Sequence, residues 1–319
     1  MDEPGLGKRI LVTGGPGFIG RRLVRRLAES GAQVWTTGLP GEPAPAGAAQ
    51  HRELDVRDSE AVRALVAAAA PEIVFHLAAT GVTDPGVAPA LALAVNAGGT
   101  LNLLAALEGL PVERVVLAGT CYEYGARETV EGLDPFNAYA ASKVAAWAWG
   151  RMYWRAHGLP VVTARPFQVY GPGQPNRTLV PAAIHAALAG EDFPLTPGEQ
   201  ERDFIYLDDL VDGLVAIAGA PGIAGQSLDL GTGQAHAVLR VVERIWALTG
   251  ARGRILPGAL PYRPGVVMHL VAAADRTARL TGWRAHVGLE EGLRRTVQEV
   301  QRKSGLAGRG QTQMTQSEC

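Results

Sequence analysis

A glycine-rich turn near the N-terminus constrains the fold more than any other feature of the chain. It follows the short strand-like run Arg9–Thr13 and precedes a helical pattern of leucines and charged residues. Gly14, Gly17 and Gly20 permit a tight turn, close approach of a pyrophosphate to backbone N–H groups, and close packing of the helix on the strand. The N-terminus of that helix then faces the anion. The turn therefore predicts a dinucleotide-binding strand-turn-helix unit.

Strand and helix patterns alternate along the first half of the chain. Strand-like runs lie at residues 33–37, 73–77 and 114–119, and helical patterns lie at 58–69, 96–107 and 138–157. This alternation predicts an α/β fold, a Rossmann-type doubly wound parallel sheet with its ligand at the carboxyl edge of the strands. Beyond residue 165 the pattern shifts, which indicates a smaller mixed α/β C-terminal portion.

We expect the chain to divide into three regions. The dinucleotide-binding Rossmann domain occupies mainly residues 1–165, and the substrate-binding domain occupies mainly residues 166–302, with an exchange of strands between the two. Residues 303–319 are polar and aperiodic, which predicts a disordered tail.

Composition and charge exclude several classes of function. The 319 residues include 30 Lys and Arg against 31 Asp and Glu, and the net charge of −1 favours neither nucleic acid nor an anionic membrane. Two cysteines rule out a disulfide framework, and the acidic N-terminus does not match a signal peptide. The longest uncharged run, residues 85–107, contains Pro89 and Asn96 and is typical of a loop followed by a buried helix. We therefore expect a cytoplasmic protein without a membrane or nucleic-acid partner.

The end of the second strand bears on the choice of cofactor. An acidic residue at this place holds the ribose 2′-hydroxyl in NAD-selective sites, but this strand ends in Gly38-Leu39-Pro40. Without that carboxylate nothing repels a 2′-phosphate, although no arginine stands beside the turn to bind one. We expect the cofactor to be NADP(H) or NAD(H), with a slight preference for NADP(H). Ala78 and Ala79, small residues at the end of the fourth strand, leave room for the cofactor.

Tyr139 and Lys143 stand four residues apart in a helical pattern, so their side chains share one face. A free tyrosine has a pKa of ~10, which is roughly 3 units too high for proton transfer near neutral pH. An ammonium ~4 Å away, at an effective dielectric constant of ~20, supplies about the 4 kcal/mol needed. The alternative is an unremarkable pair on a solvated helix face. The fifth strand delivers Thr120 to the same edge of the sheet, which favours a general acid/base for a sugar or alcohol oxygen.

Other residues with chemically active side chains have plainer explanations. His76 lies within a strand run and is expected in the core. Cys121 has no neighbouring histidine, so we expect it to line the pocket or to be a spectator. Arg202 and Arg263 lie beside turn signals, and they either converge on a diphosphate or are solvated on the surface. No HExxH or CxxC motif is present, so we expect no metal.

Large aromatic residues lie on both sides of the predicted helix at 138–157. They are Trp147, Trp149, Tyr153 and Trp154. At ~100° per residue, Trp149 and Tyr153 point nearly opposite to the other two. We expect one side to pack on the sheet and the other to meet a second subunit. The predicted assembly is a homodimer formed through the helices near 90–108 and 138–157.

Taken together, the motifs resemble the extended short-chain dehydrogenase/reductase family of nucleotide-sugar epimerases, dehydratases and reductases, over about residues 8–300. The matching motifs are Thr13–Gly20, Asp55–Val56, His76–Ala79, Asn96 with Gly99–Thr100, Tyr139–Lys143, Arg165–Phe167, Tyr170–Gly173, Arg202–Phe204 and Arg263–Gly265. The resemblance implies that Tyr139 is the acid/base, that Lys143 lowers its pKa and holds the nicotinamide ribose, and that Thr120 hydrogen-bonds the reacting oxygen.

The resemblance also implies which residues bind the cofactor and the nucleotide-sugar substrate. The cofactor residues are Gly14, Gly17, Phe18, Ile19, Gly20, Gly38, Asp55, Val56, Leu77, Ala78, Ala79, Asn96, Tyr139, Lys143, Pro166, Phe167 and Val169. The substrate residues are Thr80, Cys121, Tyr122, Gln168, Arg202 and Arg263, and the two arginines hold the diphosphate.

Departures from the family pattern bear on the reaction. Family dehydratases follow the catalytic Thr with an Asp-Glu pair, and here Cys121 and Tyr122 stand instead, which disfavours 4,6-dehydration. Gln168 replaces the usual Asn. The lead hypothesis is NADPH-dependent reduction of a nucleotide-linked 4-ketosugar, and the alternative is an NAD-dependent 4-epimerase. Less favoured are a reductase of small carbonyl compounds and a non-catalytic NADP-binding redox sensor.

Overall fold

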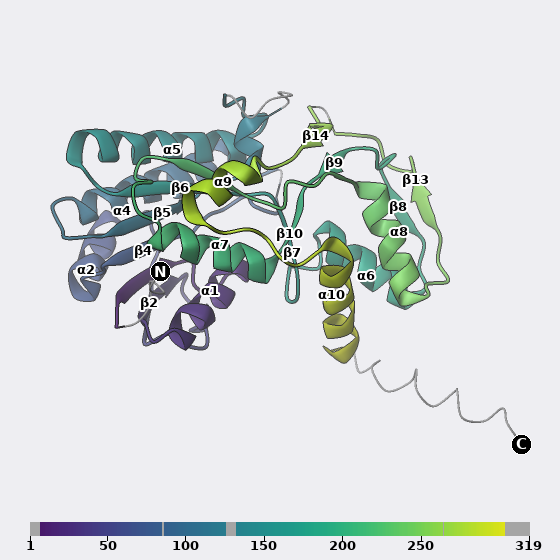
Figure 1. Cartoon of the computed structure of the whole chain (residues 1–319), viewed down its shortest axis with the longest axis horizontal. Coiled ribbons are helices and arrows are strands. Elements are labelled where there is room, and N and C mark those ends of the chain that lie inside the picture. The colour runs from purple at the N-terminus through teal and green to yellow at the C-terminus, as the bar shows by residue number, and fades with distance from the viewer. Residues whose placement is uncertain (1–6, 85, 126–131, 264, 304–319) are drawn as a thin grey trace, which may run out of the picture.

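The computed structural model describes residues 7–84, 86–125, 132–263 and 265–303, and its larger part is built on one parallel sheet (Figure 1). Seven strands pair in the order β11-β6-β5-β4-β1-β2-β3. They are β1 Arg9–Thr13, β2 Gln33–Gly38, β3 Gln50–Glu53, β4 Ile73–His76, β5 Arg114–Ala118, β6 Val161–Pro166 and β11 Ser227–Leu230. The strand order reverses between β1 and β4, as in a doubly wound sheet. The predicted Rossmann-type α/β fold is therefore confirmed.

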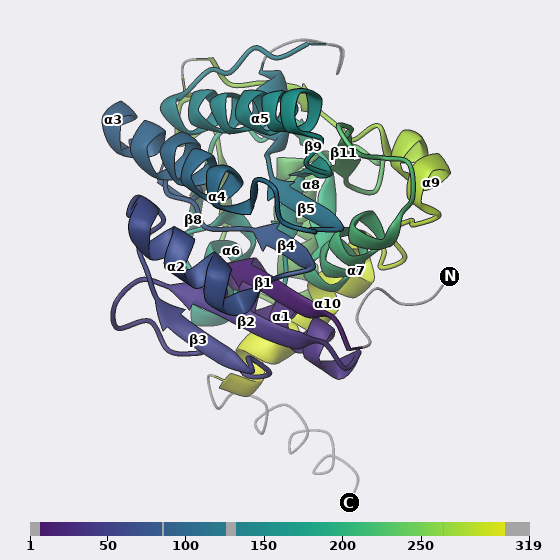
Figure 2. The same cartoon turned by 90° about the vertical axis from the view of Figure 1, so that its left-hand side faces the viewer.

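Helices cover both faces of this sheet (Figure 2). They are α1 Phe18–Glu29, α2 Ser59–Ala69, α4 Gly99–Leu107, α5 Ala138–His157, α7 Leu207–Gly219 and α9 Ala274–Thr281. Ile10 and Val12 join the apolar cluster of α1 and α7, whereas Leu11 joins that of α2, α4 and α5. Successive strand residues point to opposite faces, so both faces are buried and the central strands β1, β4 and β5 are largely apolar. The edge strand β3 is polar and mostly exposed.

The local sequence fixes where α5 begins and ends. The Asn137 side chain accepts a hydrogen bond from the Ala140 backbone N–H at 2.8 Å and caps the first turn. The helix ends at Gly158, whose backbone is left-handed with φ 68°. Tyr139 and Lys143 consequently lie in the first and second turns of α5, beside the carboxyl end of β5.

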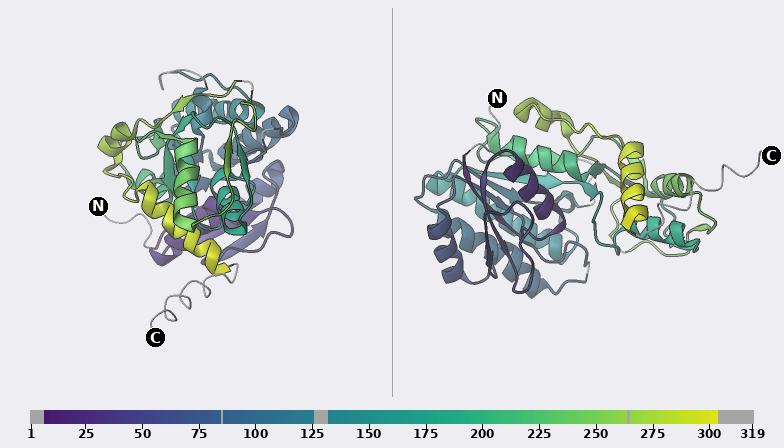
Figure 3. Two further views of the ribbon diagram at one scale, coloured as in Figure 1. Left: turned by 90° about the vertical axis from the view of Figure 1, so that its right-hand side faces the viewer. Right: turned by 90° about the horizontal axis from the view of Figure 1, so that it is seen from below.

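The smaller part of the molecule lies beyond the carboxyl edge of the sheet, at the right of Figure 1. Its elements are β7 Gln168–Tyr170, α6 Leu179–Ala189, β8 Phe193–Leu195, β9 Glu201–Arg202, β10 Phe204–Tyr206, β12 His236–Ala237, α8 Val238–Thr249, β13 Ile255–Pro257, β14 His269–Leu270 and α10 Leu289–Lys303. Seen from below, α10 stands at the junction with the larger part (Figure 3). The chain crosses between the parts more than once, because β11 returns to pair with β6.

The helix expected at 96–107 begins earlier than the sequence pattern indicates. It starts with α3 Pro89–Ala92, continues as the π-helical turn η1 Leu93–Gly98, and leads into α4. Proline is favoured in the first helical turn, which explains why Pro89 begins the helix. The stretch Pro89–Leu107 has a mean hydropathy of 1.6 and is long and apolar enough to cross a membrane, a property that core helices share. Here its elements pack against α5 and α2.

The expected tail at 303–319 lies outside the described residues from 304 onward.

Candidate active site

The glycine turn has the shape that a dinucleotide requires. Gly14 has φ 70°, and a Cβ there would lie 2.8 Å from the backbone nitrogen of Ala78. A Cβ on Gly20 would overlap the carbonyl oxygen of Gly14, so helix α1 packs against the turn only without one. Gly17 caps α1, and among the described residues no side chain accepts from its first N–H groups. Phe18 and Ile19 begin the helix, so these N–H groups face outward at a terminus that favours an anion.

The end of β4 lies directly against this turn. The backbone N–H of Leu77 donates to the Thr13 carbonyl at 3.2 Å, and that of Ala78 donates to the Thr13 hydroxyl at 3.3 Å. His76 is buried between the hydroxyls of Thr13 and Thr100, at 2.7 and 3.0 Å. Burial lowers the pKa of His76 to about 3, so it is a neutral core residue, as the sequence predicts.

Asn96 links three segments around the site. Its side chain accepts from the Thr80 backbone N–H at 2.8 Å and donates to the Thr80 carbonyl at 3.0 Å. It also donates to the Ser142 hydroxyl at 2.8 Å. Both amide hydrogens of Asn96 are thus used to hold the loop after Ala79 against α5. The predicted contacts of Asn96 with the cofactor and of Thr80 with the substrate stay predictions.

The three predicted catalytic residues meet at the carboxyl edge of the sheet. Thr120, Tyr139 and Lys143 are all buried, and the Thr120 hydroxyl lies close enough to the Tyr139 phenol to act against the rise of its pKa. The Lys143 Nζ lies 5.9 Å from the centroid of the Tyr139 ring and donates to the Ala118 carbonyl at 2.8 Å. This arrangement can hold one substrate oxygen between two hydroxyl groups with an ammonium nearby.

Burial governs the protonation of the catalytic pair. It raises the pKa of Tyr139 above its usual range, against the opposing effect of the hydrogen bond from Thr120. Burial also lowers the pKa of Lys143 to about 8. The role of Lys143 in lowering the pKa of Tyr139 stays a prediction, because burial is the largest effect on the phenol. The desolvation of the phenol outweighs the favourable groups around it.

A buried ion pair that the sequence analysis missed positions Thr120. The Glu123 carboxylate accepts the Thr120 backbone N–H at 2.8 Å and the Arg165 Nε–H at 2.8 Å. The Thr120 side chain in turn caps the short helix η2 Cys121–Tyr124, which completes a capping box. Threonine followed three residues later by glutamate was the available sequence signal.

The predicted substrate residues gather beside this short helix. Cys121 is buried, and burial raises the pKa of its thiol to about 12, which fits a wall residue rather than a nucleophile. The Gln168 side chain donates to the Tyr122 hydroxyl at 2.6 Å. Arg202 and Arg263 both act on Tyr122, where their charges oppose the rise of its pKa caused by burial. The two arginines therefore lie within electrostatic reach of one buried side chain.

Residues of β6 and β7, and Phe167 between them, lie next to the residues of η2. Phe167 is buried in a cluster with Cys121, Tyr124 and Val267. Pro166 ends β6, and Val169 is partly buried in β7. Their predicted nicotinamide contacts stay predictions.

The ends of β2 and β3 require a correction. From the sequence we expect no carboxylate beside Gly38, but the Glu42 Oε2 lies 2.8 Å from where a Cβ of residue 38 would stand. Glu42 comes from a loop without periodicity, so no pattern indicated it. Asp55 forms a bidentate pair with Arg57, with 2.6 Å between Oδ2 and Nη2. Val56 packs against Gly99 and is buried. The adenine contacts of Asp55 and Val56 stay predictions.

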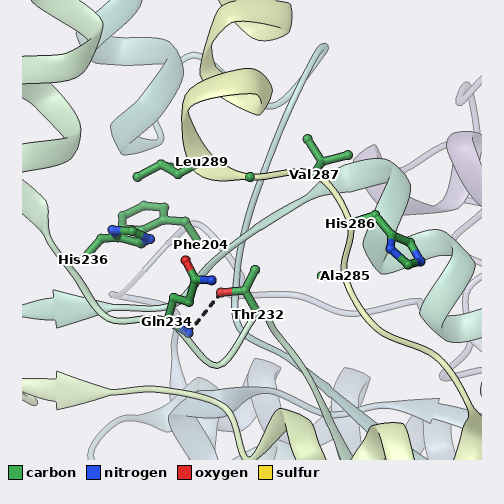
Figure 4. Close-up of a pocket in the computed structure, with 9 residues that line it drawn as sticks. Phe204, Thr232, Gln234, His236, Ala285, His286, Val287 and Leu289 are labelled. Atoms are coloured by element: carbon green, nitrogen blue, oxygen red, sulfur yellow. Dashed lines mark hydrogen bonds between the residues drawn. The ribbon is translucent and has the colours of Figure 1, made fainter.

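Two cavities lie outside this site. One of about 120 Å³ lies between Phe204, Thr232 and the segment before α10, where the Gln234 backbone N–H donates to the Thr232 hydroxyl at 3.1 Å (Figure 4). The other, of about 450 Å³, lies between α5 and β11 and includes Arg151 and Arg276. Neither contains Tyr139. Within the described ranges, no three His, Cys, Asp or Glu side chains gather as metal ligands would.

A doubly wound sheet with a dinucleotide turn and a buried Tyr–Lys–Thr set at its carboxyl edge defines a class of nicotinamide-dependent enzymes that act at a hydroxyl-bearing carbon. The chain belongs to the NAD dependent epimerase/dehydratase family, whose model matches residues 10–231. The protein is thus an enzyme that uses a nicotinamide dinucleotide, and the resemblance found in the sequence is confirmed.

Individual relatives agree with this assignment. The chain is 32% identical over 318 residues to a UDP-glucose 4-epimerase of Mycolicibacterium smegmatis, a match that covers 93% of this chain and 99% of the relative. The solved UDP-glucose 4-epimerase of Thermotoga maritima, with UDP-glucose, is 27% identical with a TM-score of 0.86, covering 92% of this chain and 99% of that one. The solved MoeE5, in complex with UDP-glucose and NAD, is 32% identical with a TM-score of 0.82, covering 92% and 99%.

Proposed function

We propose that the protein is an NAD-dependent nucleotide-sugar 4-epimerase. The observation that carries the proposal is the meeting of the buried side chains of Thr120 and Tyr139 at the end of β5, beside the ammonium of Lys143. Two hydroxyls on one substrate oxygen suit proton transfer at a carbinol carbon. The names of the epimerase relatives support C4 as that carbon. A nicotinamide dinucleotide held at the turn of Gly14, Gly17 and Gly20 would supply the acceptor and donor of hydride for that carbon.

Each catalytic residue then has a definite task. Tyr139 takes the proton from the C4 hydroxyl and gives it back when the sugar carbon is reduced on its other face. Thr120 holds the same oxygen through a hydrogen bond. Lys143, fixed by the Ala118 carbonyl, places positive charge near the phenol and stabilises its ionised form. Burial of all three residues keeps water from competing for the proton.

The residues present fit the dinucleotide. The turn at Gly14 and Gly20 leaves no space for side chains, so a pyrophosphate held there would meet backbone N–H groups at the start of α1. Ala78 and Ala79 at the end of β4 leave the adjoining edge of the sheet open to the nicotinamide half. Lys143 and Tyr139 lie at the far side of that edge.

The surroundings of Thr120 argue against 4,6-dehydration, the other reaction in the family's name. A dehydratase needs a carboxylate free to take a proton from C5. The nearest carboxylate along the chain, Glu123, is fully buried and occupied by Arg165 and the Thr120 N–H. Cys121, the residue after Thr120, has its thiol pKa raised to about 12 and is no base at neutral pH.

The substrate end of the site suits a diphosphate. Arg202 and Arg263 bring two cations to the neighbourhood of Tyr122, and guanidinium groups match phosphate oxygens with paired donors. Arg202 is buried, which strengthens its attraction for an anion. A nucleotide-linked sugar would place its diphosphate here and its C4 oxygen at Thr120.

A second candidate is reduction of a nucleotide-linked 4-ketosugar by added NAD(P)H. The contact that favours it is the 2.6 Å hydrogen bond between Gln168 and Tyr122, because two side chains fixed to each other would restrict rotation of a sugar bound beside them. An epimerase must let the ketosugar rotate, whereas a reductase presents only one face. The same three catalytic residues serve both reactions.

One experiment separates the two reactions. Purified protein is denatured to measure released dinucleotide, and intact protein is incubated with UDP-glucose or UDP-galactose without added cofactor. The proposal predicts near-stoichiometric NAD and interconversion of the two sugars, lost in Tyr139→Phe. Turnover that needs added NAD(P)H and a ketosugar would assign the protein as a reductase instead. Because the proposal does not specify the nucleobase of the substrate, dTDP, GDP and CDP sugars are assayed in parallel.

A further inference from the structure

The carboxyl end of β2 carries a carboxylate that its own sequence lacks. An ideal Cβ on Gly38 would lie 2.8 Å from the Glu42 Oε2 and 2.7 Å from the Pro16 Cγ. Pro16 belongs to the glycine turn between β1 and α1. The Glu42 carboxylate therefore occupies the space that a side chain at position 38 would fill, directly beside the dinucleotide turn.

The loop holds this carboxylate in place. The Glu42 Oε2 accepts the Leu39 backbone N–H at 2.7 Å, and the Glu42 N–H donates to the Leu39 carbonyl at 3.0 Å. The His51 ring bonds the Glu42 carbonyl at 3.2 Å and the Thr36 hydroxyl at 2.8 Å, which fastens the loop to β2. The Glu42 residue is nevertheless exposed, so a ligand can reach it.

A second carboxylate stands at the same edge. Glu53 ends β3, and its Oε1 accepts the Gly41 backbone N–H at 2.9 Å. Nearby cations are engaged elsewhere, since Arg57 pairs with Asp55 at 2.6 Å. Arg52 lies over the Trp35 ring at 5.9 Å and, as the neighbour of Glu53 in a strand, points to the opposite face. The edge is thus acidic where an adenosine ribose would lie.

We propose that Glu42 is the residue that selects NAD over NADP. Its carboxylate accepts the 2′-hydroxyl of the adenosine ribose, in place of the missing acid at position 38, and together with Glu53 it repels a 2′-phosphate. This inference rests on the proposed function only in assuming a nicotinamide dinucleotide at the glycine turn. It reverses the expectation from sequence that NADP is the preferred cofactor.

Direct binding tests the inference without any sugar chemistry. The dinucleotides that co-purify with the wild type are quantified by mass spectrometry. Dissociation constants for NADH and NADPH are then measured by fluorescence titration of stripped protein. The wild type is expected to carry NAD(H) and to bind NADH at least 10-fold more tightly. In Glu42→Gln the ratio of the two constants falls 10-fold or more, whereas Glu60→Gln, an exposed glutamate on α2, leaves it unchanged.

Two results would overturn the inference. A wild type that binds NADPH as tightly as NADH excludes selection at this edge. A Glu42→Gln variant that loses both cofactors in equal proportion shows that Glu42 only shapes the loop. Failure of the proposed function is seen separately, because a protein with the expected binding ratios can still lack activity at C4.

Discussion

The Glu123 carboxylate holds the backbone of Thr120 from within the protein, at 2.8 Å from its nitrogen. Its other oxygen binds Arg165, and the exposed fractions of the two side chains are 0% and 6%. A buried pair of this kind ties the reacting end of β5 to β6. The position of the Thr120 hydroxyl thus depends on two charged residues that never touch the substrate in our account.

Removal of that charge should destabilise the protein. Glu123→Gln keeps an acceptor for the Thr120 N–H but removes the carboxylate that pairs directly with the buried Arg165. Breaking a buried pair costs about 3–5 kcal/mol, which urea unfolding measures. Glu243→Gln, at the exposed pair with Arg240, is the control and should change the free energy of unfolding by less than about 0.5 kcal/mol. If Glu123→Gln and Glu243→Gln changed the free energy of unfolding equally, this would contradict the role of Glu123 in positioning Thr120.

Loss of the Tyr139 hydroxyl should remove proton transfer while the pocket keeps its shape. General acid/base groups contribute about 10²–10⁴-fold, so kcat of Tyr139→Phe should fall by that factor. The dissociation constant of NADH should stay within about threefold. Tyr153→Phe, a buried change on the same helix, is the matched control and should retain activity. Turnover in Tyr139→Phe that equals the control removes every catalytic role assigned above.

The lowered pKa of Lys143, about 8, predicts how activity varies with pH. The ammonium loses its proton as pH rises through 8, so kcat/KM should decline above that pH. Lys143→Arg stays charged and should move the decline to higher pH, whatever its absolute rate. A decline at the same pH in both proteins would show that another group is responsible.

The same shift predicts the pH dependence of stability. An unfolded lysine has a pKa of ~10.4, so between pH 8 and that value the unfolded chain binds more protons than the folded one. Stability relative to Lys143→Met should therefore rise with pH across this window and level off above it. Urea unfolding at a series of pH values measures the difference. If the difference in the free energy of unfolding between the wild type and Lys143→Met fell as pH rose, burial would stabilise the ammonium of Lys143 instead of destabilising it.

The two arginines should affect substrate binding more than chemistry. Charge-assisted hydrogen bonds contribute about 1.5–3 kcal/mol, or roughly 10- to 150-fold in affinity. Arg202→Gln and Arg263→Gln should each raise KM for the nucleotide sugar by such a factor, with kcat less affected. Arg252→Gln, on an exposed loop, is the control. Unchanged KM in both variants would favour a small carbonyl substrate without a diphosphate.

The predicted homodimer rests on exposed apolar side chains of the expected helices. They are Leu91, Leu93 and Trp149, with exposed fractions of 41%, 58% and 39%. Trp149→Arg should convert the dimer to monomers in sedimentation velocity. Leu280→Arg, on α9 with the same exposed fraction of 39%, should leave the mass unchanged. A monomeric wild type, or a dimeric Trp149→Arg, would contradict this assembly.

Much of the site could be predicted from sequence because strand ends in a parallel sheet meet at one edge. Thr120 follows β5, and Tyr139 lies in the first turn of the long helix α5. Asn137 caps the start of that helix, and Gly158 caps its end. Topology alone therefore brings Thr120, Tyr139 and Lys143 together. The helix at 138–157 has the predicted bounds for the same local reasons.

What the sequence could not reveal depends on chain paths and on burial. Glu42 lies in a loop without periodicity, so nothing in the pattern places its carboxylate beside Gly38. The partner of Glu123 is 42 residues away along the chain, so its capping box was visible but its ion pair was not. The pKa of Tyr139 follows from how deeply the phenol is buried, which spacing on a helix does not determine.

The proposed 4-epimerase function requires that hydride leaves C4 of a nucleotide-linked sugar and returns to it within one active site. UDP-galactose carrying deuterium at C4 is incubated with purified protein in ordinary water without added cofactor, and the products are analysed by NMR. We expect UDP-glucose that retains deuterium at C4, with no formation in Tyr139→Phe. Washout of the label into water, or no conversion of any of the nucleotide sugars tested unless NAD(P)H is added, would contradict it.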